Sequence, residues 1–209
     1  MEIKKSKLNP EKDNFFRIFL YICIMKTLLI HAEDATTDFL STIYDGKDWT
    51  IVKKNIGKSK LKSLIKEHDI IVMMGHGTEK GLADADFNFL IDGQYVYLLR
   101  EKTCIGIWCN ADQFFKKHSL KGLATGMIIS DTMEANLYCV DATYQEVEDS
   151  NFKFAQSVKH SLILEDLKLT KEKIQETYEV KDGVTEFNQK NIHLFGDELV
   201  FCEKSKIHD

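Results

Sequence analysis

Hydrophobic residues gather in short blocks along the chain, separated by charged or turn-forming residues. Several blocks are uninterrupted runs of Ile, Leu, Val and Met, which are typical of parallel strands buried on both faces of a sheet. Such runs predict strands at residues 27–31, 49–52, 69–74, 103–108, 125–130, 191–195 and 199–201. The chain therefore has enough strand candidates for a central sheet.

Other blocks repeat their apolar residues every three or four positions, as one face of an amphipathic helix does. These blocks predict helices at residues 35–43, 58–68, 111–120, 151–162 and 165–178, the last polar enough to be largely exposed. Asp34 and Ser150 are the expected caps of the first and fourth helices, because their side-chain oxygens can accept from free backbone N–H groups. Asp92-Gly93 stands between two apolar segments of residues 87–97 and predicts a hairpin turn.

Strands and helices alternate along the chain, which argues for an α/β protein. We predict a three-layer sandwich with a mostly parallel central sheet of about six strands, helices on both faces and a small β-hairpin insertion. No Gly/Ser-rich linker or repeat interrupts the chain, and its 209 residues suffice for one domain with a full core. Residues 25–209 are therefore expected to form a single domain after an N-terminal extension or arm at 1–24.

The N-terminal residues allow two interpretations. Lys4, Lys5 and Lys7 precede an apolar run at residues 15–25, which is the order found in secretory signal peptides. However, Arg17 interrupts the run, no small-residue cleavage site follows, and the run is too short to span a bilayer. We favour an arm on a cytoplasmic protein over a secreted protein. The five cysteines agree, because an odd number without a Cys-x-x-Cys pair is a poor disulfide framework.

Charge and motifs disfavour several classes of function. With a net charge of -5, the chain lacks the excess of Lys and Arg that nucleic acid binding requires. No Cys or His spacing matches a zinc site. Gly-x-Gly-x-x-Gly and Gly-Lys-Ser/Thr loops are both missing, which argues against a nucleotide- or flavin-binding domain. We expect no cofactor, no nucleic acid partner and no membrane partner, while the oligomeric state stays open.

Two residues with catalytic chemistry follow neighbouring strand candidates. His76 lies between two glycines after the strand at 69–74, and Cys109 ends the strand at 103–108. Open α/β sheets bind ligands beyond the carboxyl ends of their strands, so both side chains are expected at one edge. A thiol nucleophile needs a partner such as His, which can accept and return a proton near neutral pH. The backbone N–H groups of Gly77 and Cys109 are suited to form an oxyanion hole.

These blocks resemble those of caspase-like cysteine peptidases, a group that includes caspases, gingipains, clostripain, separases and CHAT-domain proteases. Residues 71–77 (Ile-Val-Met-Met-Gly-His-Gly) are similar to the hydrophobic strand and His-Gly of that family. Residues 103–111 are similar to its next block, a hydrophobic strand that ends in the nucleophilic Cys. Residues 194–197 (Leu-Phe-Gly-Asp) are similar to a Phe-Gly-Asp-Pro stretch near the end of gingipain-like and CHAT domains.

The resemblance implies an activity and roles for two residues. The chain would be a cysteine endopeptidase that hydrolyses peptide bonds through an acyl-enzyme, with Cys109 as nucleophile and His76 as general acid/base. No metal or organic cofactor is implied. Trp108 departs from the family pattern, which usually has a small residue before the Cys, and Glu198 stands where Pro is typical. Because Trp108 can crowd the site or wall the pocket, a catalytically silent binding or scaffold module is the alternative.

A substrate pocket is predicted from acidic residues in two loops. In the family, the loops after the first strand and after the strand following the Cys shape the pocket for the residue before the scissile bond. Here they carry Glu33 and Asp34, then Asp131 and Glu134. Carboxylates in a concave site favour Arg or Lys in a peptide or protein substrate. Solvated loop acids are the alternative, and Asp131 is the preferred pocket residue because it directly follows a predicted strand.

Overall fold

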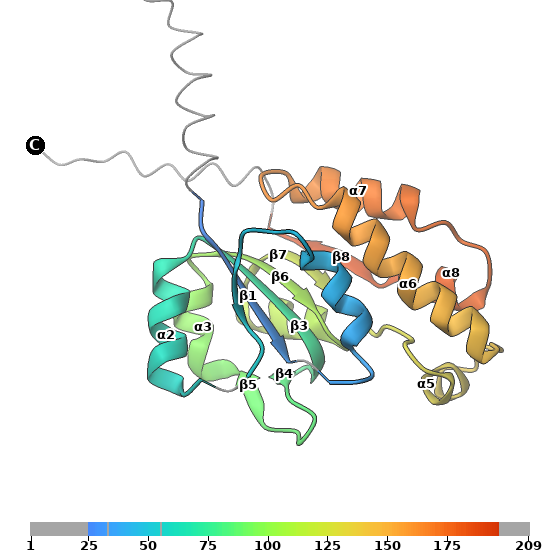
Figure 1. Cartoon of the computed structure of the whole chain (residues 1–209), viewed down its shortest axis with the longest axis horizontal. Coiled ribbons are helices and arrows are strands. Elements are labelled where there is room, and N and C mark those ends of the chain that lie inside the picture. Colours follow the sequence, from blue (N-terminus) through green and yellow to red (C-terminus); the bar gives the residue numbers. More distant parts are fainter. Residues whose placement is uncertain (1–24, 33, 55, 197–209) are drawn as a thin grey trace, which may run out of the picture.

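A computed structural model describes residues 25–32, 34–54 and 56–196 (Figure 1). The predicted arm at 1–24, Glu33, Glu198 and the predicted strand at 199–201 lie outside the described residues. The described strands are β1 (Thr27–Ala32), β2 (Thr50–Val52), β3 (Ile70–Thr78), β4 (Gly81–Ala83), β5 (Phe89–Ile91), β6 (Thr103–Ile107), β7 (Lys121–Thr125) and β8 (Ile192–Phe195).

The helices lie between these strands along the chain, four of them in succession between β7 and β8. The α-helices are α2 (Lys58–Glu67), α3 (Val96–Leu99), α4 (Ala111–His118), α5 (Thr132–Leu137), α6 (Tyr144–Ser161), α7 (Leu167–Thr177) and α8 (Gly183–Lys190). Two 3-10 helices, η1 (Asp38–Tyr44) and η2 (Gly93–Tyr95), complete the set. Within the described residues, no helix has both the length and the apolar character needed to cross a membrane.

The central sheet runs in the order β2-β1-β3-β6-β7-β8, and β4 and β5 extend it beyond the end of β3. All pairs along the main sheet are parallel except β7 with β8. Helices α2 and α3 lie on one side of the sheet, and α6 and α7 lie on the other (Figure 1). The structure therefore confirms the predicted three-layer α/β sandwich with a mostly parallel sheet.

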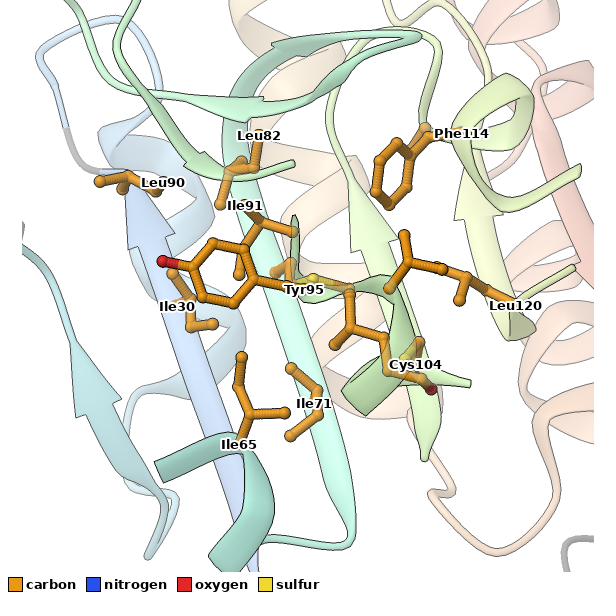
Figure 2. Packing of buried hydrophobic residues seen from close by; sticks show 14 of the residues in the cluster. Ile30, Ile65, Ile71, Leu82, Leu90, Ile91, Tyr95, Cys104, Phe114 and Leu120 are labelled. Atoms are coloured by element: carbon orange, nitrogen blue, oxygen red, sulfur yellow. Dashed lines mark hydrogen bonds between the residues drawn. The ribbon is translucent and has the colours of Figure 1, made fainter. Parts of the chain in front are cut away.

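Successive residues of each strand face opposite layers, so two hydrophobic cores form. On one face, Ile71 of β3 packs in the same cluster as Ile65 of α2 and Phe114 of α4 (Figure 2). On the other face, Val72 packs in a cluster with Phe154 of α6. The uninterrupted apolar runs of the sequence follow from this double coverage, because no strand residue in the centre can face water.

The register of the central strands determines where the candidate catalytic residues lie. Met74 of β3 pairs with Ile107 of β6, and these strands are parallel. His76 and Cys109 each follow one member of this pair by two residues. Both therefore leave the main sheet at the same edge, where open α/β sheets bind their ligands.

The predicted strand at 125–130 is wrong, because the strand is β7 and ends at Thr125. The apolar residues that follow form a loop, although Ile128 and Ile129 are buried. The side chain of Asn188 replaces a neighbouring strand there: its Oδ1 accepts from Ile129 N–H at 2.7 Å and its Nδ2 donates to Ile129 O at 2.9 Å. An apolar run can thus be buried without strand pairing when a side-chain amide satisfies its backbone.

The predicted hairpin turn at Asp92-Gly93 is also wrong. The Asp92 carboxylate accepts from Gln94 N–H at 2.8 Å and caps η2, so the chain turns into a helix there. The antiparallel insertion consists instead of β3, β4 and β5, and residues 84–88 connect its last two strands. An Asp-Gly pair is compatible with a hairpin turn and with a helix start, because the same Asp oxygen can accept from a backbone N–H in either one.

Helix boundaries differ most where buried polar residues imitate caps. Thr143, which forms a capping box with Glu146, starts α6, whereas Ser150 lies inside that helix and hydrogen-bonds Tyr178 Oη at 2.6 Å. The segment predicted as an exposed helix is α7, and Ile174 is fully buried on its inner face. The predicted helix at 35–43 is η1, while α5 and α8 were not predicted.

Two phenylalanines of α6 provide a matched test of this packing. Phe154 is 2% exposed in the second core, whereas Phe152 is 61% exposed on the same helix. We expect Phe154→Ala to lower the free energy of unfolding by about 3–5 kcal/mol, because it removes buried area and leaves a cavity. Phe152→Ala is expected to change it by less than ~0.5 kcal/mol. Urea denaturation followed by circular dichroism measures both, and equal effects would contradict the assigned layers.

Candidate active site

His76 lies on an extension of β3 beyond the main sheet. The residues up to Gly75 pair with β1, and from His76 onward β3 pairs with β4 instead. The change of partner occurs at Gly75, whose φ of +133 and close approach to Ala32 exclude a side chain: a Cβ there would lie 2.8 Å from Ala32 O. The sequence predicted that the strand ends at Met74, but it continues through His76 to Thr78.

One nitrogen of the His76 ring is held by the loop after β1. Nε2 lies 3.0 Å from Asp34 Oδ2 and 2.7 Å from Thr36 Oγ1. Thr36 Oγ1 also donates its single hydrogen to Asp34 Oδ1 at 2.7 Å. Since an ionised carboxylate only accepts, Nε2 must carry the hydrogen in this network. Nδ1 then carries the lone pair, and it contacts no hydrogen-bond partner among residues 25–32, 34–54 and 56–196.

The Asp34 carboxylate is fixed in the same way from the opposite side. Its Oδ1 accepts from Thr36 N–H at 2.7 Å and from Thr37 N–H at 3.2 Å. Burial raises the pKa of Asp34, but hydrogen bonds from Thr36 and the nearby His76 outweigh it, and the net pKa is lowered. Asp34 is therefore ionised at neutral pH and oriented toward His76. Its predicted role as a helix cap is wrong, because η1 begins after Thr37 and has no side-chain cap.

Cys109 lies in the turn between β6 and α4, and β7 anchors this turn. Thr125 Oγ1 accepts from Trp108 N–H at 3.1 Å and donates to Trp108 O at 2.9 Å. Asn110 N–H donates to Gly126 O at 3.1 Å, and Asn110 adopts a left-handed φ of 65. These bonds place Cys109 at a sharp strand-to-helix junction.

The Cys109 thiol is neutral at physiological pH. It donates to Ile128 O at 3.7 Å. Burial raises the pKa of Cys109 to about 11, and the negative charges of Glu134 and, to a smaller extent, Asp131 add to this rise. The hydrogen bond to Ile128 O opposes it. A nucleophilic Cys109 therefore has to lose its proton to a base during attack.

Both residues line the same two cavities. A small cavity of about 30 Å³ lies between them and the second core, and an open groove of about 560 Å³ passes over them. The groove is mostly apolar, with Ala83, Phe87, Phe89 and Met127 in its walls. The structure thus brings His76 and Cys109 to one concave surface.

The backbone N–H groups expected to form an oxyanion hole belong to Cys109, in the turn after β6, and to Gly77, in β3. The N–H of Cys109 donates to no atom in the described part of the chain. Gly77 pairs with Leu82, next to the Thr78–Gly81 pair that flanks a two-residue turn. In an antiparallel ladder, residue pairs that exchange hydrogen bonds alternate with pairs that do not. The pair that flanks a two-residue turn exchanges hydrogen bonds, so the next pair, Gly77 with Leu82, does not. The N–H of Gly77 is therefore directed away from β4.

Trp108 is buried in the first core next to the site and does not line the groove. Its side chain is 2% exposed, packs in the first core and donates from Nε1 to Thr78 O at 3.1 Å. A Cβ on Gly77 would lie 2.2 Å from Trp108 Cδ1, so the indole occupies the space that a side chain at 77 would need. Trp108 was predicted as a groove residue, but among the two cavities it lines only the small one.

The predicted acidic pocket is only partly assembled. Asp34 and Glu134 line the groove, Asp131 is not among the described residues that line it, and Glu33 lies outside the described residues. Asp131 Oδ1 accepts from Glu134 N–H at 2.8 Å and caps α5, so the strand-end argument for Asp131 fails together with the predicted strand. Glu134 Oε2 accepts from Ser130 N–H at 2.7 Å and from its hydroxyl at 2.9 Å.

Sequence reasoning missed two threonines that hold the candidate dyad. Thr36 contacts His76 across 40 residues, and Thr125 anchors the Cys109 turn across 17. The Asp-x-Thr spacing of Asp34 and Thr36, which allows the Asp side chain to accept two residues ahead, is a signal that would have identified the first. Nothing in the sequence distinguishes Thr125 from an ordinary strand residue.

Comparisons with known proteins identify no family. No family model matches the chain, and no curated protein matches it. Among solved structures, a variant of the imine reductase from Myxococcus stipitatus, in complex with NAD+, is similar at 15% sequence identity with a TM-score of 0.31. The match covers 51% of this chain and 41% of that chain. A likeness this low carries no argument about this chain.

The raised pKa of Cys109 predicts slow alkylation that accelerates with pH. With a pKa of about 11, only on the order of one thiol in a thousand is ionised at pH 8. We expect iodoacetamide to modify Cys109 with a rate that rises about tenfold per pH unit up to that pKa. Glu134→Gln removes a negative charge and is expected to lower the pKa and accelerate the reaction.

Peptide mapping by mass spectrometry resolves Cys109 from the other cysteines. Cys139, which is exposed, provides the reference for reagent access in the same sample. Rapid modification of Cys109 at pH 7, or no effect of Glu134→Gln, would contradict the electrostatic environment described above.

Proposed function

We propose that this protein is a cysteine endopeptidase that uses His76 and Cys109 as its catalytic dyad. The observation that carries the proposal is their shared groove, in which Nδ1 of His76 and the N–H of Cys109 are both without an internal partner among the described residues. Both residues also stand in the blocks that resemble caspase-like peptidases. A base and an anion-stabilising donor beside a thiol are the groups that acyl transfer requires.

In this mechanism, His76 Nδ1 removes the thiol proton while the sulfur of Cys109 attacks the peptide carbonyl carbon. The carbonyl oxygen becomes an oxyanion and accepts from the N–H groups of Cys109 and Gly77. His76 then gives its proton to the leaving amine, and the C–N bond breaks to leave a thioester. Water attacks the thioester with His76 as base, which releases the new carboxyl end and restores the thiol.

Asp34 acts as a positioning residue in this scheme. Its carboxylate holds the hydrogen on Nε2 and thereby leaves Nδ1 as the basic nitrogen. When His76 takes the thiol proton, the adjacent negative charge stabilises the imidazolium. This assigns Asp34 to the dyad rather than primarily to the substrate pocket.

The same groove supports a preference for basic substrates. The carboxylates of Asp34, Asp84 and Glu134 line it, and no lysine or arginine stands among the described residues of its walls. Such a negative field favours Arg or Lys near the scissile bond. The thiols of Cys104, Cys109 and Cys139 are free, which supports a reducing compartment such as the cytoplasm.

One observation favours a second function, a catalytically silent binding module. Burial, together with the acidic groups near Cys109, raises its pKa to about 11, whereas catalytic thiols commonly have a lowered pKa. In a silent module the groove would bind a peptide without cleaving it. Activity measurements separate the two functions.

Peptide cleavage by the dyad is tested with a diverse peptide mixture and mass spectrometry. We expect the wild type to cut, and Cys109→Ala and His76→Ala to reduce the rate by at least ~100-fold each. Because the two residues act as a unit, the double variant should be no slower than the single ones. Arg or Lys is expected before the cut bonds. Intact peptides in all samples would favour the silent module, and cuts that persist in Cys109→Ala would indicate a contaminating protease.

The role of Asp34 gives a separate kinetic prediction. Asp34→Asn is expected to lower kcat by roughly 100-fold or more with little change in KM, because it disturbs the tautomer and charge support of His76. Asp34→Glu should recover part of kcat. Asp45→Asn, an exposed acid that pairs with Lys159, is the matched control. A change in KM alone would instead assign Asp34 to substrate binding.

A further inference from the structure

The loop between β4 and β5 presents an aromatic side chain on a strained backbone. Phe87 has a φ of 61 and is 82% exposed. Bulky L-residues rarely adopt this left-handed conformation, and turns that need it normally use Gly or Asn. Burial does not explain the choice of Phe, since most of its side chain contacts solvent.

The loop is rigidly constructed around Asp84. Phe87 N–H donates to Asp84 O at 3.0 Å, and Asp84 N–H donates to Asn88 O at 3.0 Å. The Asp84 side chain accepts from Asp86 N–H at 3.0 Å and from Asn88 N–H at 2.9 Å. These bonds impose the left-handed position whatever residue occupies it. Since the backbone does not favour Phe at this position, its side chain is the feature that needs an explanation.

Phe87 stands at the rim of the groove that contains the candidate dyad. Phe89, Ala83 and Met127 also line this groove, as Cys109 does. The carboxylates of the same groove leave it negative, with no lysine or arginine among its described wall residues. One concave surface therefore combines an exposed aromatic ring with a negative field. An extended peptide with an apolar and a basic side chain complements both features.

We propose that Phe87 is a specificity-determining residue that binds a bulky apolar side chain of a peptide substrate, while a basic side chain of the same peptide faces the groove carboxylates. This inference rests on the proposed function for its consequence in catalysis, but the binding itself requires no catalysis. The occupant is an extended peptide of this composition, and the loop fixes the backbone of Phe87 before the peptide arrives, which reduces the entropy lost on binding.

Substitution at Phe87 separates binding from folding because the two effects have opposite signs. Phe87→Asn relieves the backbone strain and is expected to raise the melting temperature, since Asn tolerates a left-handed φ. The same change removes the ring and is expected to weaken peptide binding by roughly tenfold. Phe87→Tyr retains the ring and should retain affinity. Phe152→Asn, an exposed Phe of α6 outside the groove lining, is the matched control.

Binding is measured with the full chain carrying Cys109→Ala, so that no probe is cleaved. The probes are fluorescein-labelled Gly/Ser dodecapeptides with one Arg and one Leu at varied spacing, and counterparts in which Ser replaces Leu or Gln replaces Arg. Fluorescence anisotropy reports the Kd. We expect tightest binding with Arg and Leu together, a loss with either replacement, and an effect of Phe87→Asn only on the peptides that contain Leu.

The outcomes distinguish this inference from the proposed function. Equal affinities for Phe87→Asn and its parent, or no binding of any peptide, would overturn the role of Phe87. Phe87-dependent binding without cleavage by the Cys109-containing protein would uphold the role of Phe87 and remove the endopeptidase. Cleavage with a KM that is insensitive to Phe87→Asn would uphold the endopeptidase and overturn the role of Phe87.

Discussion

The contact between Trp108 and Gly77 is the packing constraint on which the site depends. The indole occupies the space beside Gly77 and donates to Thr78 O, so it joins the extension of β3 to the end of β6. His76 precedes this contact and Cys109 follows it in sequence. Because the indole is buried, neither strand end can shift without opening the first core. The large residue that looked like an obstruction to catalysis instead fixes the relative position of the two candidate catalytic groups.

Electrostatics then divide the site into two parts with different consequences. Burial and the acidic groups around Cys109 disfavour the thiolate, while Asp34 holds the hydrogen on His76 Nε2. The thiol therefore rests protonated, and in the proposed mechanism it gives up its proton only when a carbonyl receives the charge of the sulfur. A thiol of this kind resists oxidation and adventitious alkylation, because both reactions require the thiolate. In the proposed peptidase, the thiol gains selectivity for a bound peptide carbonyl at the expense of intrinsic reactivity.

The sequence predicted the parts of the molecule that depend on continuous burial. The apolar runs of β1, β3 and β6 have one physical explanation, so the layers and the edge that holds His76 and Cys109 were predictable. Errors arose where polar side chains complete the backbone bonding of a distant segment. The side chain of Asn188 bonds the backbone of the apolar run after β7, which is therefore buried as a loop. The side chain of Asp92, in a dipeptide typical of turns, caps the helix η2. The pairing of Asp34 with His76 was equally hidden, since it joins residues 42 positions apart.

The hydrogen bonds between Asn188 and the loop after β7 have a consequence for synthesis of the chain. This loop carries Ile128, which accepts from the Cys109 thiol, and Met127, which lines the groove. Its backbone is secured by a residue 59 positions downstream of Ile129. A nascent chain still attached to the ribosome therefore has β3 and β6, and with them His76 and Cys109, long before it has the anchor of the loop beside them. The groove therefore cannot mature before Asn188 has been synthesised, and shorter chains lack the finished site.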